Sequence, residues 1–408
     1  MGGFSQPDVE ALSAALDEPT WLLERRLEAW GYAEKLDLPK EKDEPWRYTD
    51  LRRLKFSLDR FTAAEPDPFD AGLALPRDPV LEERGVVVLP LYNAMQTRPD
   101  QLREHLFSQT NPGQDVFTAL HGALFSGGTY IYVPPSVEVE VPIEAVRTVS
   151  QGGVGVFPHT LVVLGDGARL VFIDRSESEP LDPPVLSIPT VEVVVGRDAS
   201  LNLVSIQEYG IGVWNVQHQH VALAAGASLT SLMVLLGGSF SRAEVRTALN
   251  GPAADASMLG LYFAEDDQHF DMRTLQDHAA PRCSSDLLYK GALKDRSHTV
   301  YSGLIRVQPG AEKTDAYQAN RNLVLSDHAK ADSKPELEIL NNDVRCTHGS
   351  TVGQVDENQL FYLQSRGISP DEATRLIVEG FFEDVINRLN VEPVREALHS
   401  AIERKLGR

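Results

Sequence analysis

The amino-acid sequence predicts a mainly β protein whose core is a β-solenoid flanked by α-helical regions. Three observations lead to this prediction. From about Gly127, short β-branched runs alternate with small-residue turns for over 200 residues. One strand-turn-strand phrase, as in "VVLGDGARLVFI" and "VVVGRDASLNLV", returns at intervals of about thirty residues without an intervening helix, which is typical of a solenoid. The chain before and after this part has the apolar spacing of helices.

The first region, residues 1–126, is predicted to be helical with irregular connections. Apolar residues have helical spacing in "DVEALSAAL" and "TWLLERRLEAWGYAEKL", and helical character returns in "PDQLREHLFSQTN" and "DVFTALHGALF".

The second region, residues 127–353, is the predicted solenoid. Its turn phrases align on an alanine at Ala168, Ala199, Ala227 and Ala256. A β-sandwich would also have regularly spaced strands, but it does not require one turn phrase at one period. Later turns align on Ala311, Ala329 and Val344 at about half the interval, so we expect two such turns in each coil. The alignment places Cys346 at the position of Leu170, at the start of one of the last strands.

The third region, residues 354–408, is predicted to be a helical cap. A first helix ends at Gly367, and the next begins with Ser369 as N-cap, Pro370 at N1 and Glu372 at N3, the pattern of a capping box. This helix is more apolar than a small cap can bury against itself, which predicts an exposed partner-binding patch. The predicted patch consists of Leu376, Ile377, Phe381, Phe382, Val385 and Ile386.

Composition restricts the classes of function. The formal net charge is −21, which argues against binding nucleic acid through phosphates and against binding anionic membranes. No run of 18 apolar residues is present, and the N-terminus lacks the pattern of a secretory signal. With only two cysteines, Cys283 and Cys346, a disulfide framework is not expected, and the reducing cytoplasm is the expected location. The sequence also lacks a P-loop motif, so any nucleotide-derived energy would come from a partner.

Two histidine-containing stretches allow metal binding as an alternative. His218 and His220, six and eight residues after Gly212, have the H-x-H spacing of a cupin-like, metal-dependent β-barrel enzyme. The carboxylate that should follow a few residues later is absent, so stacked histidines on a solenoid rung are the simpler interpretation. A second stretch has no zinc spacing, and internal polar ladders would explain it equally well; it holds His269, Asp271, Asp277, His278 and Cys283.

Cys346 and His348 form the third candidate site. Residues i and i+2 of a strand share a face, so the thiol and the imidazole should project together. A lone cysteine in a strand is often only a small buried hydrophobe. Together, however, the two are a suitable soft ligand pair for iron or an iron–sulfur cluster. Two side chains do not complete a cluster, so such a site would be shared with another chain.

Three segments resemble the SufB/SufD family of iron–sulfur cluster assembly proteins. They are "EPWRYTDL", "TDAYQANRNLVLSD" and "KADSKPELEILNNDVRCTHGSTVGQVDENQLFYLQSRGIS", and the resemblance extends over essentially the whole chain. The chain is most similar to the SufD-type members. It lacks the "GSQCGAH"-like cysteine segment of SufB-type chains, and the corresponding "NRNLVLSDHAKADS" contains no cysteine.

The resemblance implies a right-handed parallel β-helix and a role as a non-catalytic scaffold subunit of a SufBCD complex. SufB would bind through the β-helix, and the SufC ATPase would bind through the C-terminal helices. A nascent, transient iron–sulfur cluster would form at the SufB interface with His348, beside Cys346, as its ligand, and none would be tightly bound in the isolated chain. A homodimer is possible when the chain is isolated.

Overall fold

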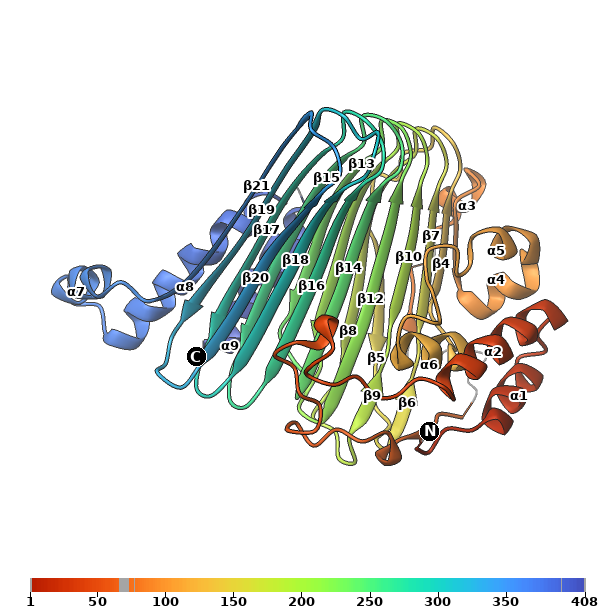
Figure 1. Cartoon of the computed structure of the whole chain (residues 1–408), viewed down its shortest axis with the longest axis horizontal. Coiled ribbons are helices and arrows are strands. Elements are labelled where there is room, and N and C mark those ends of the chain that lie inside the picture. The colour runs from red at the N-terminus through yellow and green to blue at the C-terminus, as the bar shows by residue number, and fades with distance from the viewer. Residues whose placement is uncertain (1, 66–72, 77, 390, 407–408) are drawn as a thin grey trace.

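The computed structural model describes residues 2–65, 73–76, 78–389 and 391–406. It confirms a mainly β fold in which a parallel β-helix is flanked by N- and C-terminal helices (Figure 1). The strands form two facing sheets, and the chain alternates between them, adding one strand to each sheet per coil. This alternation explains why the turn phrase occurs twice in each coil.

The first sheet has 12 strands. Its main path contains β3 (Val87–Pro90), β4 (Thr129–Val133), β7 (His159–Leu164), β10 (Thr190–Val195), β12 (Val213–Leu223), β14 (Phe240–Leu249), β16 (His269–His278), β18 (His298–Val307) and β20 (Lys330–Ile339). Three short strands extend it: β1 (Thr62–Ala63), β6 (Val154–Val156) and β9 (Val185–Ser187).

The second sheet has nine strands. They are β2 (Leu73–Ala74), β5 (Ile143–Thr148), β8 (Arg169–Glu177), β11 (Ser200–Glu208), β13 (Ser228–Leu235), β15 (Asp255–Ala264), β17 (Ser284–Leu293), β19 (Thr314–Val324) and β21 (Val344–Gln354). All pairs from β5 to β21 are parallel.

The register corrects the predicted alignment at two turns. Asp255 pairs with Ser228, so Ala254, and not Ala256, occupies the turn position. The "GPAADAS" turn contains several alanines, and periodicity alone did not distinguish them. Likewise Thr314, and not Ala311, lies opposite Val344. The predicted equivalence of Cys346 and Leu170 is confirmed, because successive register pairs connect them through the sheet.

Most of the N-terminal helices cover the outer face of the 12-stranded sheet, whereas Pro79–Glu83 packs through Leu81 against the interior core (Figure 1). The N-terminal helices are α1 (Gln6–Ala15), α2 (Thr20–Ala33), α3 (Pro79–Glu83), α4 (Leu91–Thr97), α5 (Pro99–His105) and α6 (Val116–Leu124), with short 3-10 turns at Glu44–Trp46 and Leu58–Arg60. Aromatic packing joins the two parts, since the ring centroids of Phe56 and Trp214 of β12 are 5.1 Å apart. Within the N-terminal region, Trp46 stacks on Phe117 of α6 at 5.3 Å between ring centroids.

A buried ionic cluster connects the segment around Thr49, which follows α2, to the outer face of the 12-stranded sheet. The Asp271 carboxylate is fully buried and accepts hydrogen bonds from Thr49 Oγ1 at 2.7 Å and from Arg242 Nη1 at 2.5 Å. Arg273 Nε is 2.8 Å from the other oxygen. The arginines lower the pKa of Asp271 although burial opposes this, so the carboxylate is ionised. Thr49 belongs to the "EPWRYTDL" segment, so this segment has a structural role: it holds the N-terminal region against the sheet.

Replacing this carboxylate should strongly destabilise the protein. In Asp271→Ala, the buried Arg242 would lose its closest ionic partner and keep only Glu244, 3.9 Å away; breaking a buried ion pair in this way typically costs about 3–5 kcal/mol of unfolding free energy. Urea unfolding followed by circular dichroism measures the loss. The control is Asp267→Ala, which removes an exposed ion pair with Arg296 and should change stability little. Equal effects of the two variants would contradict the buried-cluster interpretation.

The C-terminal helices are α7 (Glu357–Ser365), α8 (Pro370–Ile386) and α9 (Glu392–Lys405). Gly367 has a positive φ of 87°, as expected after a helix end. Ser369 caps α8, because its hydroxyl accepts from the Glu372 backbone N–H at 3.3 Å. The capping box is not completed, since the Glu372 carboxylate pairs with Arg375 at 2.5 Å instead.

Helices α8 and α9 pack against the outer face of the nine-stranded sheet. Lys290 of β17 anchors α8, because its ammonium group donates to Phe381 O at 2.7 Å and to Asp384 Oδ2 at 2.5 Å. Helix α7, in contrast, lies beyond the last strands, at the end of the molecule farthest from the N-terminal helices (Figure 1).

Candidate functional site

The solenoid is open at its C-terminal end. β20 and β21 are the last strands of their sheets, and within the described part of the chain they pair only with β18 and β19. Both strands are long and carry unpaired backbone groups on their outer edges. Such edges pair readily with another chain unless they are blocked.

Cys346 and His348 lie on β21 and face the interior of the coil. Cys346 packs with the inward-facing cluster that includes Ile305 and Ala316. Ser350 Oγ donates to Ser333 Oγ at 2.7 Å across the interior. His348 lies between these two positions at the same two-residue spacing, so it shares their face. Since no further rung covers this one, Cys346 is half-buried and His348 is exposed.

The protonation of Cys346 follows from its surroundings. Partial burial, together with the nearby negative charge of Asp315, raises the pKa of the Cys346 thiol. The thiol is therefore protonated in the free chain. Because metal binding requires the thiolate, this cysteine becomes a ligand only when a bound cation compensates for the proton that is lost.

Several apolar side chains are exposed at the same end of the solenoid. Leu337 is 39% exposed and Val352 is 49% exposed, although both lie on strands. Other exposed apolar residues at this end are Tyr317, Ile339 and Leu340. An exposed apolar surface at an open sheet edge is typical of a protein–protein contact.

A single copy does not provide a complete metal site. Among the residues that the structure describes, no group of three or more His, Cys, Asp or Glu side chains is arranged to hold a metal ion. Cys346 and His348 have the right chemistry for iron, but they are two ligands where a cluster normally takes four. The remaining ligands would have to come from another chain.

His218 and His220 do not support the enzyme alternative. Both project from the outer face of β12 and are buried beneath the N-terminal region. Burial lowers the pKa of His218, and it lowers that of His220 to about 4, so both are neutral. The solenoid also does not form the β-barrel on which that alternative depends, and the interpretation as rung histidines fits better.

The second histidine-containing stretch is divided between separate surroundings. His269 and Asp271 contact Thr49 on the outer face of β16, whereas His278 faces the interior and bonds Ser285 Oγ at 2.8 Å. Cys283 is buried and donates to Gly251 O at 3.3 Å. These side chains serve the structure.

The interior around the last coils is polar and hydrogen-bonded. Asn320 connects Tyr262 of β15 with Ser333 of β20, at 2.9 and 2.7 Å. Asn322 bonds Tyr262 and Asn320 at 2.5 and 2.7 Å. This ladder continues through Ser333 to Ser350 at the open end. It extends the polar character of the candidate site into the coil.

The burial of His278 inside the coil should make the stability of the protein sensitive to acid. Burial lowers the pKa of His278 from 6.5 to about 4, so between these values the unfolded chain binds a proton that the folded chain does not. Its contribution to stability is present above about pH 6.5 and is lost as the pH falls toward 4. We expect His278→Gln to lose roughly 2 kcal/mol less unfolding free energy than wild type between about pH 7 and about pH 5. Urea unfolding at both pH values measures this difference; parallel losses in the two proteins would contradict it.

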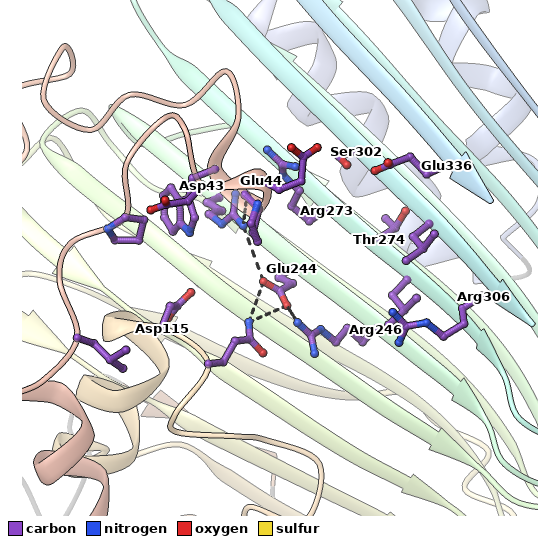
Figure 2. Close-up of a pocket in the computed structure, with 18 of the residues that line it drawn as sticks. Asp43, Glu44, Asp115, Glu244, Arg246, Arg273, Thr274, Ser302, Arg306 and Glu336 are labelled. Carbon is purple, nitrogen blue, oxygen red and sulfur yellow. Dashed lines mark hydrogen bonds and ion pairs between the residues drawn. The ribbon is translucent and has the colours of Figure 1, made fainter. Parts of the chain in front are cut away.

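A cleft of about 610 Å³ lies elsewhere, between the segment around residues 36–46 and the outer face of the 12-stranded sheet (Figure 2). Four arginines line it, and each is paired with a carboxylate. The pairs are Arg242 and Arg273 with Asp271, Arg246 with Glu244, and Arg306 with Glu338. Because these charges are compensated, the cleft does not have the electrostatics of an anion site.

The predicted partner-binding patch on α8 is partly wrong. Phe382, Val385 and Ile386 are fully buried against the nine-stranded sheet, whereas Ile377 and Phe381 are partly buried and Leu376 is 38% exposed. The α8 periodicity marked an apolar face correctly, but the solenoid itself covers most of that face. The surface that remains exposed was missed: Phe361 and Tyr362 on α7 are 74% and 58% exposed. Two adjacent aromatic residues in a polar helix were the available signal.

None of the described helices is long and apolar enough to span a membrane. The fold is that of a β-helix protein whose last coil leaves the outer edges of β20 and β21 unpaired and carries a cysteine and a histidine on one strand face. Comparison with known proteins identifies the family. Residues 146–381 match the SUF system FeS cluster assembly, SufBD core domain, and residues 76–145 match the SufBD protein N-terminal region.

Similar proteins cover nearly the whole chain. A SufBD-family iron–sulfur cluster assembly protein of Mycobacterium leprae is 35% identical over 95% of each chain, and one of Mycobacterium tuberculosis is 34% identical over 91% of this chain and 90% of its own. The iron–sulfur cluster assembly protein SufD of Bacillus subtilis is 28% identical over 98% of each chain. The chain therefore belongs to the SufBD family of iron–sulfur cluster assembly proteins.

Proposed function

We propose that this chain is a scaffold subunit on which nascent iron–sulfur clusters are assembled, at an interface between its last coil and a SufB-type partner. The observation that carries the proposal is the placement of Cys346 and His348 on a terminal strand whose outer edge is unpaired. The site is open to a partner and too small to bind a cluster alone. In this proposal the cluster is cargo that leaves the site, and the chain performs no catalysis itself.

The partner would complete both the sheets and the ligand set. A second β-helix can pair with the outer edges of β20 and β21 by strand addition, and the exposed side chains of Leu337 and Val352 would be buried in the contact. The same edges could join two copies of this chain when the SufB-type partner is absent. In the complex with the SufB-type partner, a cysteine of that partner would supply the essential thiolate.

The chemistry of the two side chains suits temporary binding. A neutral imidazole in place of one thiolate reduces the negative charge around a cluster and raises its potential. Cys346, protonated in the free chain, adds a ligand only while the cation is present. Both features favour release of the cluster over permanent binding. A free thiol at Cys346 is also in keeping with the proposed reducing cytoplasmic setting.

Energy would come from a SufC-type ATPase bound to the C-terminal helices. The sequence has no P-loop of its own, and three apolar side chains are exposed on these helices: Phe361 and Tyr362 on α7, and Leu376 in the first half of α8. We call these three residues the α7 surface. Because α7 lies beyond the last strands, an ATPase bound there would lie close to the proposed interface.

Anaerobic reconstitution tests the proposal. The chain is incubated with ferrous iron and sulfide alone, with a SufB-type partner, and with the partner plus the ATPase subunit. Cluster formation, measured by absorption and Mössbauer spectroscopy, should require the partner. A stable cluster on the isolated chain, or formation by the partner that does not depend on this chain, would contradict the proposed role.

A further inference from the structure

Gln318 lies directly beneath His348 on the preceding rung of the nine-stranded sheet. The two residues are register partners on β19 and β21. Both face the interior, since each lies between Ala316 or Cys346 on one side and Asn320 or Ser350 on the other. Gln318 is fully buried.

The side chain of Gln318 is only half satisfied. Its Nε2 donates to Gly303 O on β18 at 3.2 Å, whereas no described residue donates a hydrogen bond to its Oε1. Gly303 makes room for this amide, because a Cβ there would lie 2.5 Å from Gln318 Nε2. A buried acceptor without a partner costs free energy, so its retention calls for an explanation.

The inward-facing residues nearest to Gln318 do not donate a hydrogen bond to its Oε1. Asn320, two residues away, is bonded to Tyr262 and Ser333, and Ser333 in turn is bonded to Ser350. His348 occupies the adjacent rung, and its imidazole has no hydrogen-bond partner among the described residues, nor is it bonded to Gln318 Oε1 in this structure. Adjacent strands are about 4.8 Å apart, a separation that a glutamine and a histidine side chain can bridge.

We propose that Gln318 is a positioning residue: its Oε1 accepts the N–H of the His348 imidazole and thereby fixes which ring nitrogen presents its lone pair at the open end. Histidines that bind metals usually donate the other ring N–H to a carbonyl or carboxylate, which sets the tautomer and the ring orientation. The consequence for cluster assembly rests on the proposed function, whereas the hydrogen bond itself does not.

The test observes the tautomer directly. The full-length chain is labelled with ¹⁵N-histidine, and long-range ¹H–¹⁵N spectra are recorded under alkaline conditions that keep imidazoles neutral. The His348 signals are assigned by their absence in His348→Ala. We expect one tautomer in wild type and a mixture of both in Gln318→Met, which keeps the length of the side chain but removes both polar atoms.

Gln276→Met is the matched control. Gln276 is also fully buried with an unpartnered Oε1, but it lies on β16 in the other sheet and bonds Ser285 and the Tyr317 carbonyl. This control should leave the His348 tautomer unchanged. In cells, Gln318→Met should reduce cluster assembly about tenfold, and Gln276→Met should not.

Two results would overturn the proposal: a mixture of His348 tautomers in wild type, or an unchanged single tautomer in Gln318→Met. The first needs no variant, so it remains decisive if Gln318→Met does not fold. Full cluster assembly by His348→Ala would instead remove the proposed function, while a single wild-type tautomer that becomes a mixture in Gln318→Met would still support the hydrogen bond.

Discussion

His348→Ala should abolish cluster assembly without breaking the complex. The side chain is exposed at the open end and contributes little packing, so folding and partner binding should persist. The imidazole is, however, one of only two candidate soft ligands that this chain presents there. Changes to groups that merely support a metal ligand typically lower metal affinity or activity by about 10–100-fold. Loss of the ligand itself should therefore reduce cluster assembly at least ~100-fold.

The measurement uses cells that lack other assembly systems. Each variant is expressed with its partners, and complex recovery is compared with the activity of an iron–sulfur enzyme. Cys346→Ala should have a milder effect, because a partner cysteine would carry the essential thiolate. His328→Ala is the control, since His328 is exposed in the turn before β20. Full activity of His348→Ala would remove the site assignment, and loss of the complex would make His348 an interface residue.

Replacing both aromatic residues of the α7 surface should prevent the ATPase subunit from binding. Phe361 and Tyr362 are the most exposed aromatic side chains on the C-terminal helices, and they pack against little within the chain. Aromatic residues at the centre of an interface typically contribute at least ~2 kcal/mol each. The double variant Phe361→Ser, Tyr362→Ser should therefore weaken binding by on the order of 1000-fold.

Calorimetric titration of the purified ATPase subunit into each variant gives the affinity. The control is Val141→Ser, which removes another strongly exposed apolar side chain, 66% exposed and close to β5. Thermal unfolding of the double variant should match wild type. Unchanged affinity would show that the partner binds elsewhere. Truncation after Gly367 would be a poorer test, because it would also uncover the sheet face beneath α8 and α9.

The sequence by itself determined the architecture. The turn phrase repeats because each coil places the same small residues at the same bend, so its period indicated a solenoid with two turns per coil. Strand alternation then placed Cys346 and His348 on one face of a late strand. The N-cap of α8 at Ser369 and the glycine that follows α7 at Gly367 could likewise be predicted, since capping depends on backbone groups within a few residues.

Only the tertiary structure decided what covers each face. Apolar periodicity shows that a helix has a buried side, but it does not say whether that side meets its own solenoid or another protein. On α8, Phe382 and Ile386 therefore turned out to be core residues, while Phe361 and Tyr362 on α7 remain exposed. The position of Gln318 beneath His348 also depends on register between strands thirty residues apart, and that register is set by pairing across the coils.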